Sequence, residues 1–315
     1  MNNTLLNAHH FMKNKSPAMA IDVSSLIIKG EFYCDRTILD IFLKSGNVFV
    51  TQGFIASTSD MKYCILTRSG SNTSASLIAN ILDASRLEIW SDTNGLFTAD
   101  PRKIENAKLI KDITYKMCQE ASAVGTQMIH PYSIKPCSEK KIPIHIKNTF
   151  CPEEIGTVIN CHDKEHMHKS YMISYQGNIT VFKISSMDMW EGHGFVSDIF
   201  SVFGNEKIDV DIITTSQFSI TTTTTEKIPF KLTNVSMTLS KKYKVNVIKN
   251  CAVVSVITEQ VSKNKLVHEA NKLISEIPEK IHMIHYGDND MTLSYVVDEI
   301  HANKFMNILH RHIIE

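Results

Sequence analysis

The hydrophobic positions of this chain follow two rhythms, and the change falls at a polar stretch over residues 162–170. Before that stretch, short apolar runs alternate with helical spacing, as in residues 63–66, 73–82 and 87–90. Such alternation predicts an α/β domain with a parallel sheet. The further elements expected here are strands at 20–23, 47–56, 142–150 and near 159, and helices at 5–13, 37–44, 115–124 and 133–140.

After residue 171 the rhythm becomes βαββαβ, and it occurs twice. Strand-like runs rich in β-branched residues alternate with helices that have one apolar side. The pattern predicts two α+β modules, with 162–170 as the linker before them. The expected strands are 179–184, 210–213, 218–225, 251–257, 281–285 and 292–297, and the expected helices are 194–205, 232–241, 265–274 and 299–311.

Residues 63–102 carry the candidate chemistry. The turn over 67–72 places hydroxyl and amide side chains before a helix, and a helix N-terminus is a natural seat for a phosphate or carboxylate. Ser91 and Asp92 follow the next strand, at the sheet edge where α/β proteins bind nucleotides. By spacing alone, any βαβ unit with a serine-rich turn fits this stretch.

The order of residues resembles that of the aspartokinases. Residues 65–77, ILTRSGSNTSASL, are similar to the family's TLGRGGSD-TAALLA, and residues 89–102, IWSDTNGLFTADPR, to its IWTDVDGIYTADPR. In the second half, GFVSDIF and IDVDIITTSQFSIT, from residues 194 and 208, resemble the lysine-sensitive members. Further matches are VTQGFIA to VVTQGFIG, GTQMIHP to GAKVLHP, and KIPIHIKNTF to GIPVRIKNTF.

The resemblance implies a fold, a reaction and a site. The fold is an amino-acid-kinase domain over 1–160, a linker over 161–170 and paired ACT modules over 171–315. The reaction is transfer of the γ-phosphate of ATP, with Mg²⁺, to L-aspartate, giving 4-phospho-L-aspartate. The implied catalytic and substrate residues are Arg68, Ser71 and Asn72, and the implied ATP residues are Ser91, Asp92, Phe97, Arg102 and Gln127.

Several of these positions depart from the family pattern. Asn72 stands where the family has its catalytic aspartate, Gln127 where it has a lysine, and Thr67 and Ser69 where it has glycines. Phosphoryl transfer depends on positioned charge around the phosphate. In addition, nothing like the family's KFGGTS strand precedes Leu5. We therefore expect the chain to lack the N-terminal part of the kinase domain and to be impaired or inactive alone.

The resemblance also implies an L-lysine effector site where the first ACT modules of two subunits meet, and hence a homodimer through these modules. Asp211 would pair with the effector's ammonium group. Two positions depart: Gly192 replaces a serine, and Gln217 replaces a glutamate. The simpler reading is that Asp211 caps a turn. The implied effector residues are Met189, Gly192, Val196, Val210, Asp211, Thr215, Ser216 and Gln217.

The composition of the chain limits the partners, the metal sites and the cellular compartment that we expect. Lys+Arg and Asp+Glu are equal at 33 each, so no nucleic-acid or membrane-surface partner is expected. No apolar run has membrane-spanning length, and Met1–His10 lacks a signal-peptide core. The seven cysteines are scattered without metal spacing, which predicts no metal site and fits the reducing cytoplasm. Three histidines in the linker, at 162, 166 and 168, allow a metal, but a solvated linker is the simpler interpretation.

The expected protein is thus an aspartokinase-family member, α/β with two ACT modules, from lysine, threonine and methionine biosynthesis. One alternative is a non-catalytic regulatory subunit that binds an amino acid and dimerises. Another is a gene product that has lost its function.

Overall fold

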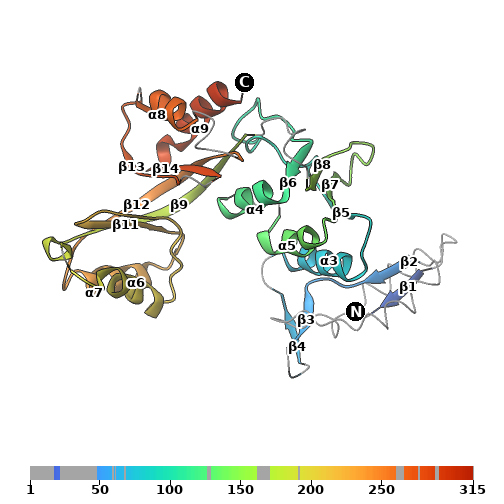
Figure 1. The fold of residues 1–315 in the computed structure, drawn as a ribbon, viewed down its shortest axis with the longest axis horizontal. Coiled ribbons are helices and arrows are strands. Elements are labelled where there is room, and N and C mark those ends of the chain that lie inside the picture. Colours follow the sequence, from blue (N-terminus) through green and yellow to red (C-terminus); the bar gives the residue numbers. More distant parts are fainter. Residues whose placement is uncertain are drawn as a thin grey trace. The chain divides into compact units, whose positions relative to one another are not determined.

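The computed structural model describes residues 18–21 (backbone only), 48–58, 60, 62–66, 69–125, 129–161, 171–190, 192–259, 266–275, 277–287 and 291–314 (Figure 1). The chain forms two compact units. The first comprises Met1–Leu96 and Leu109–His168, and the second comprises Phe97–Lys108 and Lys169–Glu315. The helices expected at 5–13 and 37–44 and the linker 162–170 lie outside the described residues. The domain boundaries taken from the sequence stay a prediction.

The first unit contains a mixed four-stranded sheet in the order β5-β7-β8-β6. β5 and β7 run parallel, β6 and β8 run parallel, and β7 and β8 run antiparallel. Two small pairs accompany this sheet, β1 with β2 and β3 with β4. The elements are β1 (Ala18–Ile21), β2 (Val48–Thr51), β3 (Ile55–Ser57), β4 (Tyr63–Ile65), α3 (Gly70–Ile81), β5 (Leu87–Ser91), β6 (Asp112–Thr114), α4 (Tyr115–Ala123), α5 (Pro131–Glu139), β7 (Ile144–Asn148) and β8 (Thr157–Asn160).

The small polar residues of α3 serve its packing against α5. Thr73 Oγ1 lies 3.0 Å from Ser133 Oγ, and Ser76 Oγ donates to Cys137 Sγ at 3.2 Å. All four residues are buried. Small side chains let two helices approach closely, so the buried serine and threonine residues of α3 serve helix packing. The first turn of α3 is the part of the helix that can still contact a ligand.

The second unit is built on one antiparallel sheet in the order β10-β11-β9-β12-β14-β13, with α6 and α7 beside one part of it and α8 and α9 beside the other (Figure 1). Two of its strands, β9 and β12, are 14 residues long. The elements are β9 (Met172–Ser185), the 3₁₀ turn η1 (Met187–Met189), α6 (Phe195–Asn205), β10 (Ile213–Thr215), β11 (Ser219–Thr224), α7 (Pro229–Leu239), β12 (Lys244–Ile257), α8 (Leu266–Ser275), β13 (Ile281–His285), β14 (Thr292–Asp298) and α9 (Glu299–Ile313).

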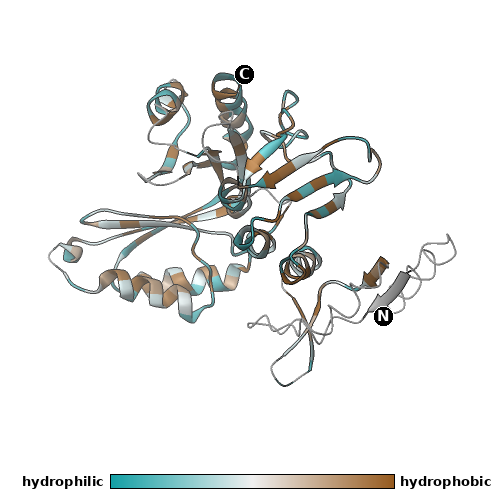
Figure 2. Cartoon of the chain, turned by 45° about the vertical axis from the view of Figure 1, so that its right-hand side comes forward, coloured by the Kyte–Doolittle hydropathy of each residue, from teal (hydrophilic) through white to brown (hydrophobic). Residues whose placement is uncertain are grey.

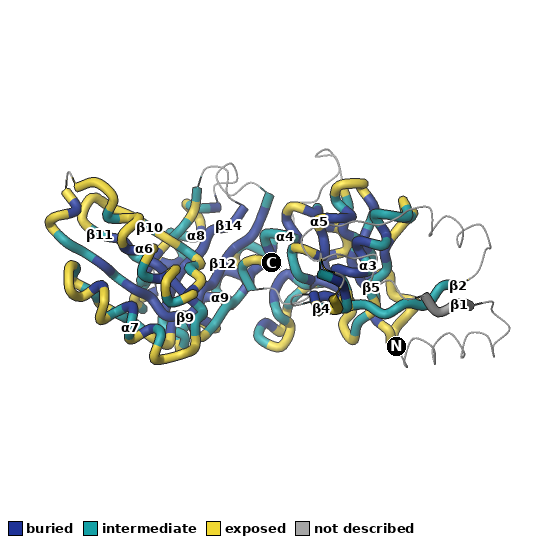
Figure 3. Tube along the Cα trace, turned by 90° about the horizontal axis from the view of Figure 1, so that it is seen from below, coloured by how far each residue is buried: buried dark blue, intermediate teal, exposed yellow. Residues whose placement is uncertain are grey.

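Buried strands form the centre of the second unit. Figure 3 shows β12 and β14 in dark blue over much of their length, and six consecutive residues of β14 are buried. One core cluster joins the sheet to α6 and α7 through Phe182 and Phe203, whose rings meet edge to face at 5.2 Å. Another joins it to α8 and α9 through Tyr295 and Phe305. Two helix layers on one sheet confirm the expected paired α+β modules.

The outer surface of α6 and α7 also carries hydrophobic positions, drawn brown in Figure 2. Phe230 is 71% exposed and Met237 65% exposed, while Val196 is 44% exposed. Contiguous exposed apolar side chains on a monomer mark surfaces that contact other molecules.

Two expected strands differ in the structure. The single strand expected over 47–56 is two strands, β2 and β3, because Phe54 between them has a positive φ of 72°. The strand expected at 210–213 begins only at Ile213. Asp211 and Ile212 instead bond irregularly to Thr223, since Asp211 N donates to its carbonyl and Ile212 N to its hydroxyl. The short strand β6 was not expected, and β9 and β12 are longer than expected. The other described helices and strands agree with expectation within a few residues.

The Phe182–Phe203 contact gives a first test. Replacing Phe203 with alanine removes a buried ring and leaves a cavity, so we expect the free energy of unfolding of the second unit to fall by about 3–5 kcal/mol. Ile300→Ala is the control in the same unit, because that side chain is 85% exposed and its loss should cost less than about 0.5 kcal/mol. Denaturant unfolding measures both, and equal losses would contradict the assignment of Phe203 to the core.

Candidate functional site

The first turn of α3 is the place where the sequence predicts an anion site in the first unit. Its N-cap residue, Ser69, makes no side-chain cap, so the turn is left open to a ligand. Ser71 is exposed and Asn72 half-buried in this turn. Arg68 and Gln127, two residues expected around the phosphates and substrate, lie outside the described residues.

Close backbone packing shapes this turn. A Cβ on Gly53 would lie 3.0 Å from Ser71 Cα, and one on Gly70 would lie 2.5 Å from the Phe54 ring. Phe54 N also donates to Ser74 Oγ at 3.1 Å. The structure therefore brings the TQGF segment against the start of α3, a neighbourhood that the sequence alone did not predict.

The carboxyl ends of β5 and β7 form the second part of the candidate site. Ser91 ends β5 opposite Asn148 of β7, and Ser91 Oγ bonds the backbone and hydroxyl of Thr93. Asp92 follows and is exposed. The same edge holds Asn94, whose side-chain oxygen accepts from Asn148 Nδ2 at 2.5 Å. Asn148 was missed as a site residue, although the IKNTF match contains it.

Phe97 and Arg102, two more residues assigned to ATP, belong to the second unit. Phe97 is half-buried. The Arg102 guanidinium forms a two-pronged ion pair with Asp100, with Nε–Oδ1 at 3.0 Å and Nη2–Oδ2 at 2.9 Å. Hydrogen bonding from Arg102 holds the pKa of Asp100 below its usual value. The arginine side chain is 89% exposed, so a phosphate can reach it from solvent.

The effector residues expected in the second unit gather only in part. An open cavity of about 300 Å³ is lined by Met189, Trp190, Phe195 and Gln217. Met189 and Gln217 were expected there. Trp190 and Phe195 were not among the expected effector residues, although both lie between the expected residues Met189 and Val196. Trp190 stacks on Phe218 at 5.3 Å with an interplanar angle of 13°. An aromatic wall of this kind holds the alkyl stem or the cation of an amino-acid side chain.

The other expected effector residues lie around the same segments. Val196 is an exposed residue of α6, Thr215 ends β10, and Ser216 Oγ lies 2.7 Å from Ser219 Oγ. Val210 packs against the α6–α7 core. Gly192 fits a tight turn, because a Cβ there would lie 2.6 Å from the Asp188 carbonyl oxygen.

The carboxyl group of Asp211, near these segments, has a raised pKa. Burial of the carboxyl group, helped by the nearby Asp209 carboxylate, raises the pKa of Asp211 to about 6, although the residue as a whole is exposed. Such a group gains from a neighbouring cation, since the cation restores the charged form. Asp211 does not line the cavity itself.

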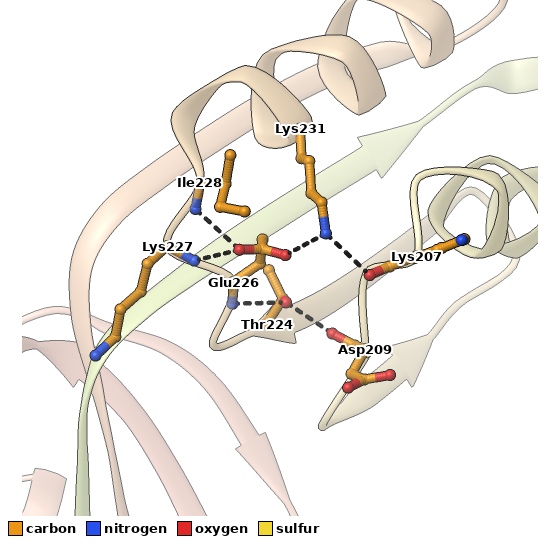
Figure 4. A network of polar contacts seen from close by, with 7 residues as sticks. All are labelled: Lys207, Asp209, Thr224, Glu226, Lys227, Ile228 and Lys231. Atoms are coloured by element: carbon orange, nitrogen blue, oxygen red, sulfur yellow. Dashed lines mark hydrogen bonds and ion pairs between the residues drawn. The ribbon is translucent and has the colours of Figure 1, made fainter.

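A polar network fixes the backbone that leads to Asp211 (Figure 4). Lys231 Nζ bonds Glu226 at 2.9 Å and the carbonyl of Lys207 at 3.3 Å. Thr224 Oγ1 donates to the carbonyl of Asp209 at 2.7 Å. The segment between α6 and β10 is thus tied at two points to the start of α7 and the end of β11.

Comparisons with known proteins agree with this architecture. Residues 3–148 match the model of the amino acid kinase family. The chain is 31% identical over 272 residues to the lysine-sensitive aspartokinase 3 of Escherichia coli, covering 84% of this chain and 60% of that enzyme. It is 35% identical over 216 residues to a bifunctional aspartokinase/homoserine dehydrogenase of Buchnera aphidicola, covering 65% of this chain and 26% of that protein.

Solved structures extend the match. E. coli aspartokinase III in complex with lysine and aspartate superposes with a TM-score of 0.81 at 27% identity, over 99% of this chain and 73% of that chain. The same enzyme with aspartate and ADP gives a TM-score of 0.82 at 27% identity and the same coverage. The strand and helix order of the first unit, the βαββαβ sheet of the second and these matches define an amino-acid-kinase fold joined to ACT regulatory modules. In sequence and in fold the chain is similar to the aspartokinases.

The chain spans 60% of the length of the E. coli relative and 26% of that of the Buchnera relative. None of the helices that the structure describes has the length and apolar character that a membrane span requires.

Ser69 gives a test of the α3 turn. Its φ of 60° and ψ of 28° place it in the left-handed region, where the family pattern has glycine. A side chain in that region costs about 1–2 kcal/mol, so Ser69→Gly should stabilise the first unit by about 1 kcal/mol. The control is Ser71→Gly, one residue into the helix, which should instead cost about 0.5–1 kcal/mol. Thermal and denaturant unfolding report both; a loss of stability in both variants would contradict a strained Ser69.

Proposed function

We propose that the first unit carries an aspartokinase-type site for ATP with Mg²⁺ and for L-aspartate, and that this site transfers phosphate slowly or not at all. The proposal rests above all on the first turn of α3. There Asn72 replaces the family's aspartate, and Ser69 replaces a glycine of the family pattern. Support for the ligands comes from E. coli aspartokinase III, which binds aspartate and ADP.

The argument for slow transfer is electrostatic. Transfer of a γ-phosphoryl group requires charges and backbone donors that are already in place around it. Removing one such donor from an enzyme costs roughly 10²–10³-fold in rate. Here an acid and a lysine are both replaced by uncharged amides, at Asn72 and Gln127. Amides still form hydrogen bonds, so nucleotide and aspartate binding survive better than transfer does.

A second function, regulatory rather than catalytic, is favoured by the cavity of the second unit. We propose that the unit binds L-lysine, with the aromatic pair Trp190 and Phe218 beside its alkyl stem and Asp211 near an ammonium group. E. coli aspartokinase III is known in complex with lysine. Gln217 lacks the negative charge that the family's glutamate has at this position. Charge-assisted hydrogen bonds are roughly twice as strong as neutral ones. Lysine binding is therefore weaker than in a relative that keeps the glutamate.

The same proposal includes a homodimer through residues 171–315. The exposed apolar side chains of α6 and α7, together with Met187 and Trp190 at 77% and 50% exposure, supply the hydrophobic surface that a dimer would bury. A chain of this kind acts as a regulatory subunit in the pathway that begins with aspartate phosphorylation and leads to lysine, threonine and methionine.

Catalysis is tested with the purified chain, ATP, Mg²⁺ and L-aspartate in a hydroxamate assay for the acyl phosphate. We expect a rate at least 10²-fold below the ~1–100 s⁻¹ of ordinary kinases, because two charged groups are replaced by amides. Calorimetry with ADP and with aspartate, run in parallel, should still detect binding. Turnover within the ordinary kinase range would disprove the proposal of an impaired site.

Lysine binding is tested by calorimetry on the whole chain at millimolar ligand. We expect weak binding at pH 7.5 that declines below about pH 6, because the Asp211 carboxyl then takes up a proton and no longer attracts an ammonium group. Asp211→Ala should abolish binding and leave the dimer intact in sedimentation. Asp209→Asn is the matched control: it removes a neighbouring charge that raises the pKa of Asp211, so binding should persist to lower pH. Binding that is independent of pH and of Asp211 would refute this assignment.

A further inference from the structure

Three side chains of different chemistry meet on neighbouring strands of the second unit. Cys251 belongs to β12, Asp298 ends β14, and His282 belongs to β13, and these strands lie side by side in the order β12-β14-β13. One ligand atom from each, a sulfur, a ring nitrogen and a carboxylate oxygen, lies within 4.8 Å of the other two. Among the described residues, this is the one group of three such side chains close enough to share an ion.

The register of the sheet explains why they meet. Cys251 and Asp298 are direct partners in the β12–β14 ladder, so their side chains lie together on one face. On β13 the pairing shifts between Ile281, opposite Val297, and Met283, opposite Val296. His282 lies inside this bulge. A second irregularity in the pairing of β12 with β9 falls at Cys251. Bulges redirect side chains and are conspicuous next to functional sites.

Burial gives the cluster a closed side and an open side. Cys251 is fully buried, and the His282 side chain is 3% exposed. The Asp298 side chain is 42% exposed and provides a path from solvent. His282 Nε2 lies 2.8 Å from Asp298 Oδ1. Nδ1 of the same ring is buried without a hydrogen-bond partner, so the imidazole is only half satisfied by the protein.

We propose that Cys251, His282 and Asp298 form a binding site for one divalent transition-metal ion of the zinc class, with solvent in the fourth position beside Asp298. A thiolate, an imidazole and a carboxylate are the ligands that zinc takes in proteins. Magnesium and calcium are disfavoured, because they select oxygen ligands throughout.

The geometry requires only side-chain adjustment. Zinc bond lengths place neighbouring ligand atoms of a tetrahedral site about 3.3–3.7 Å apart. The three ligand atoms now lie within 4.8 Å of one another, so the longest of their separations must shorten by up to roughly 1 Å. The distance between His282 Nε2 and Asp298 Oδ1, now 2.8 Å, must lengthen slightly. Binding forms the metal–sulfur bond and releases the thiol proton of Cys251 to solvent. When the ion binds Nε2, the ring proton between Nε2 and the carboxylate moves to Nδ1, so the imidazole stays neutral.

The competing interpretation is purely structural. In that case His282 and Asp298 form an ordinary polar pair, and Cys251 fills the core as a small apolar residue next to Val253 and Val296. The two interpretations differ in consequence. A bound ion would fasten the edge strand β13 to β14 and β12 and make the stability of this module depend on metal.

The experiment titrates the reduced, chelator-treated whole chain with Co²⁺ and, separately, with Zn²⁺. We expect one equivalent to bind, Co²⁺ to give thiolate-to-metal charge-transfer absorption, and Zn²⁺ to raise the melting temperature. Cys251→Ser should remove the charge-transfer absorption. Asp298→Asn, which is nearly isosteric and half-exposed, should keep the fold and weaken Zn²⁺ binding at least 10-fold, by analogy with the roughly 10–100-fold effects of changes around metal ligands.

Two controls separate this site from other donors in the chain. One replaces the exposed cysteines 151 and 161 by serine, and the other replaces histidines 162, 166 and 168 of the linker sequence by alanine. Both variants should bind the metal ion as the parent chain does. The proposal is overturned if the parent chain shows no thiolate absorption with Co²⁺. It is also overturned if Zn²⁺ affinity is unchanged in Asp298→Asn, or if binding disappears in either control.

Discussion

The antiparallel pairing of β9 with β12 is the constraint on which the second unit depends. Both strands bend at an asparagine in the left-handed region, Asn178 and Asn250, each with φ of 57°. Asparagine tolerates that conformation better than most residues do. On one side of the bend the two strands face α6 and α7, and on the other side they face α8 and α9. Two modules thus share one continuous sheet, and neither can be unfolded without exposing strands of the other.

That shared sheet also organises the loop that carries the expected nucleotide residues. Thr98 accepts from Ile173 N of β9 at 2.7 Å, and its hydroxyl lies 3.0 Å from Nε2 of the buried His310 in α9. Ala99 and Ile104 join the core formed with α8 and α9. Phe97 and Arg102 are therefore held by residues that pack in the ACT core. In physical terms, the loop is part of the regulatory module, although its sequence resembles a kinase motif.

Much of this fold could be predicted from the spacing of hydrophobic residues along the sequence. The helices α4, α6 and α9 and the strands β5, β13 and β14 have strong one-sided or continuous apolar patterns, and their limits differ little from expectation. The break at Phe54 and the irregular bonding at Asp211 could not be predicted. Each depends on a contact across the chain, from Gly70 against the Phe54 ring or from Thr223 to the loop. The membership of residues 97–108 in the second unit is likewise a tertiary property, since nothing in the local pattern distinguishes them from the kinase sequence around them.

The candidate site residues also divide into those that the sequence predicts and those that only the tertiary structure brings together. Sequence motifs alone are enough to propose the candidate residues Ser71, Asn72, Ser91 and Asp92, because the motifs place them directly after strands or at a helix start. Trp190 and Phe195 escaped because, in sequence, an aromatic residue beside a helix start is indistinguishable from core. The cluster of Cys251, His282 and Asp298 has separations far from any metal spacing, and only the register of three strands brings these residues together.

The two proposed sites differ in how much chemical change they tolerate. Phosphoryl transfer slows by roughly 10²–10³-fold when one positioned group is lost, because the transition state depends on preorganised electrostatics. An amino-acid pocket keeps partial affinity when a carboxylate becomes an amide, since shape and apolar contact still contribute. The substitutions at Asn72 and Gln127 fall on the first kind of site and Gln217 on the second. Under the two functions proposed above, a chain with this set of changes loses catalysis before it loses ligand recognition.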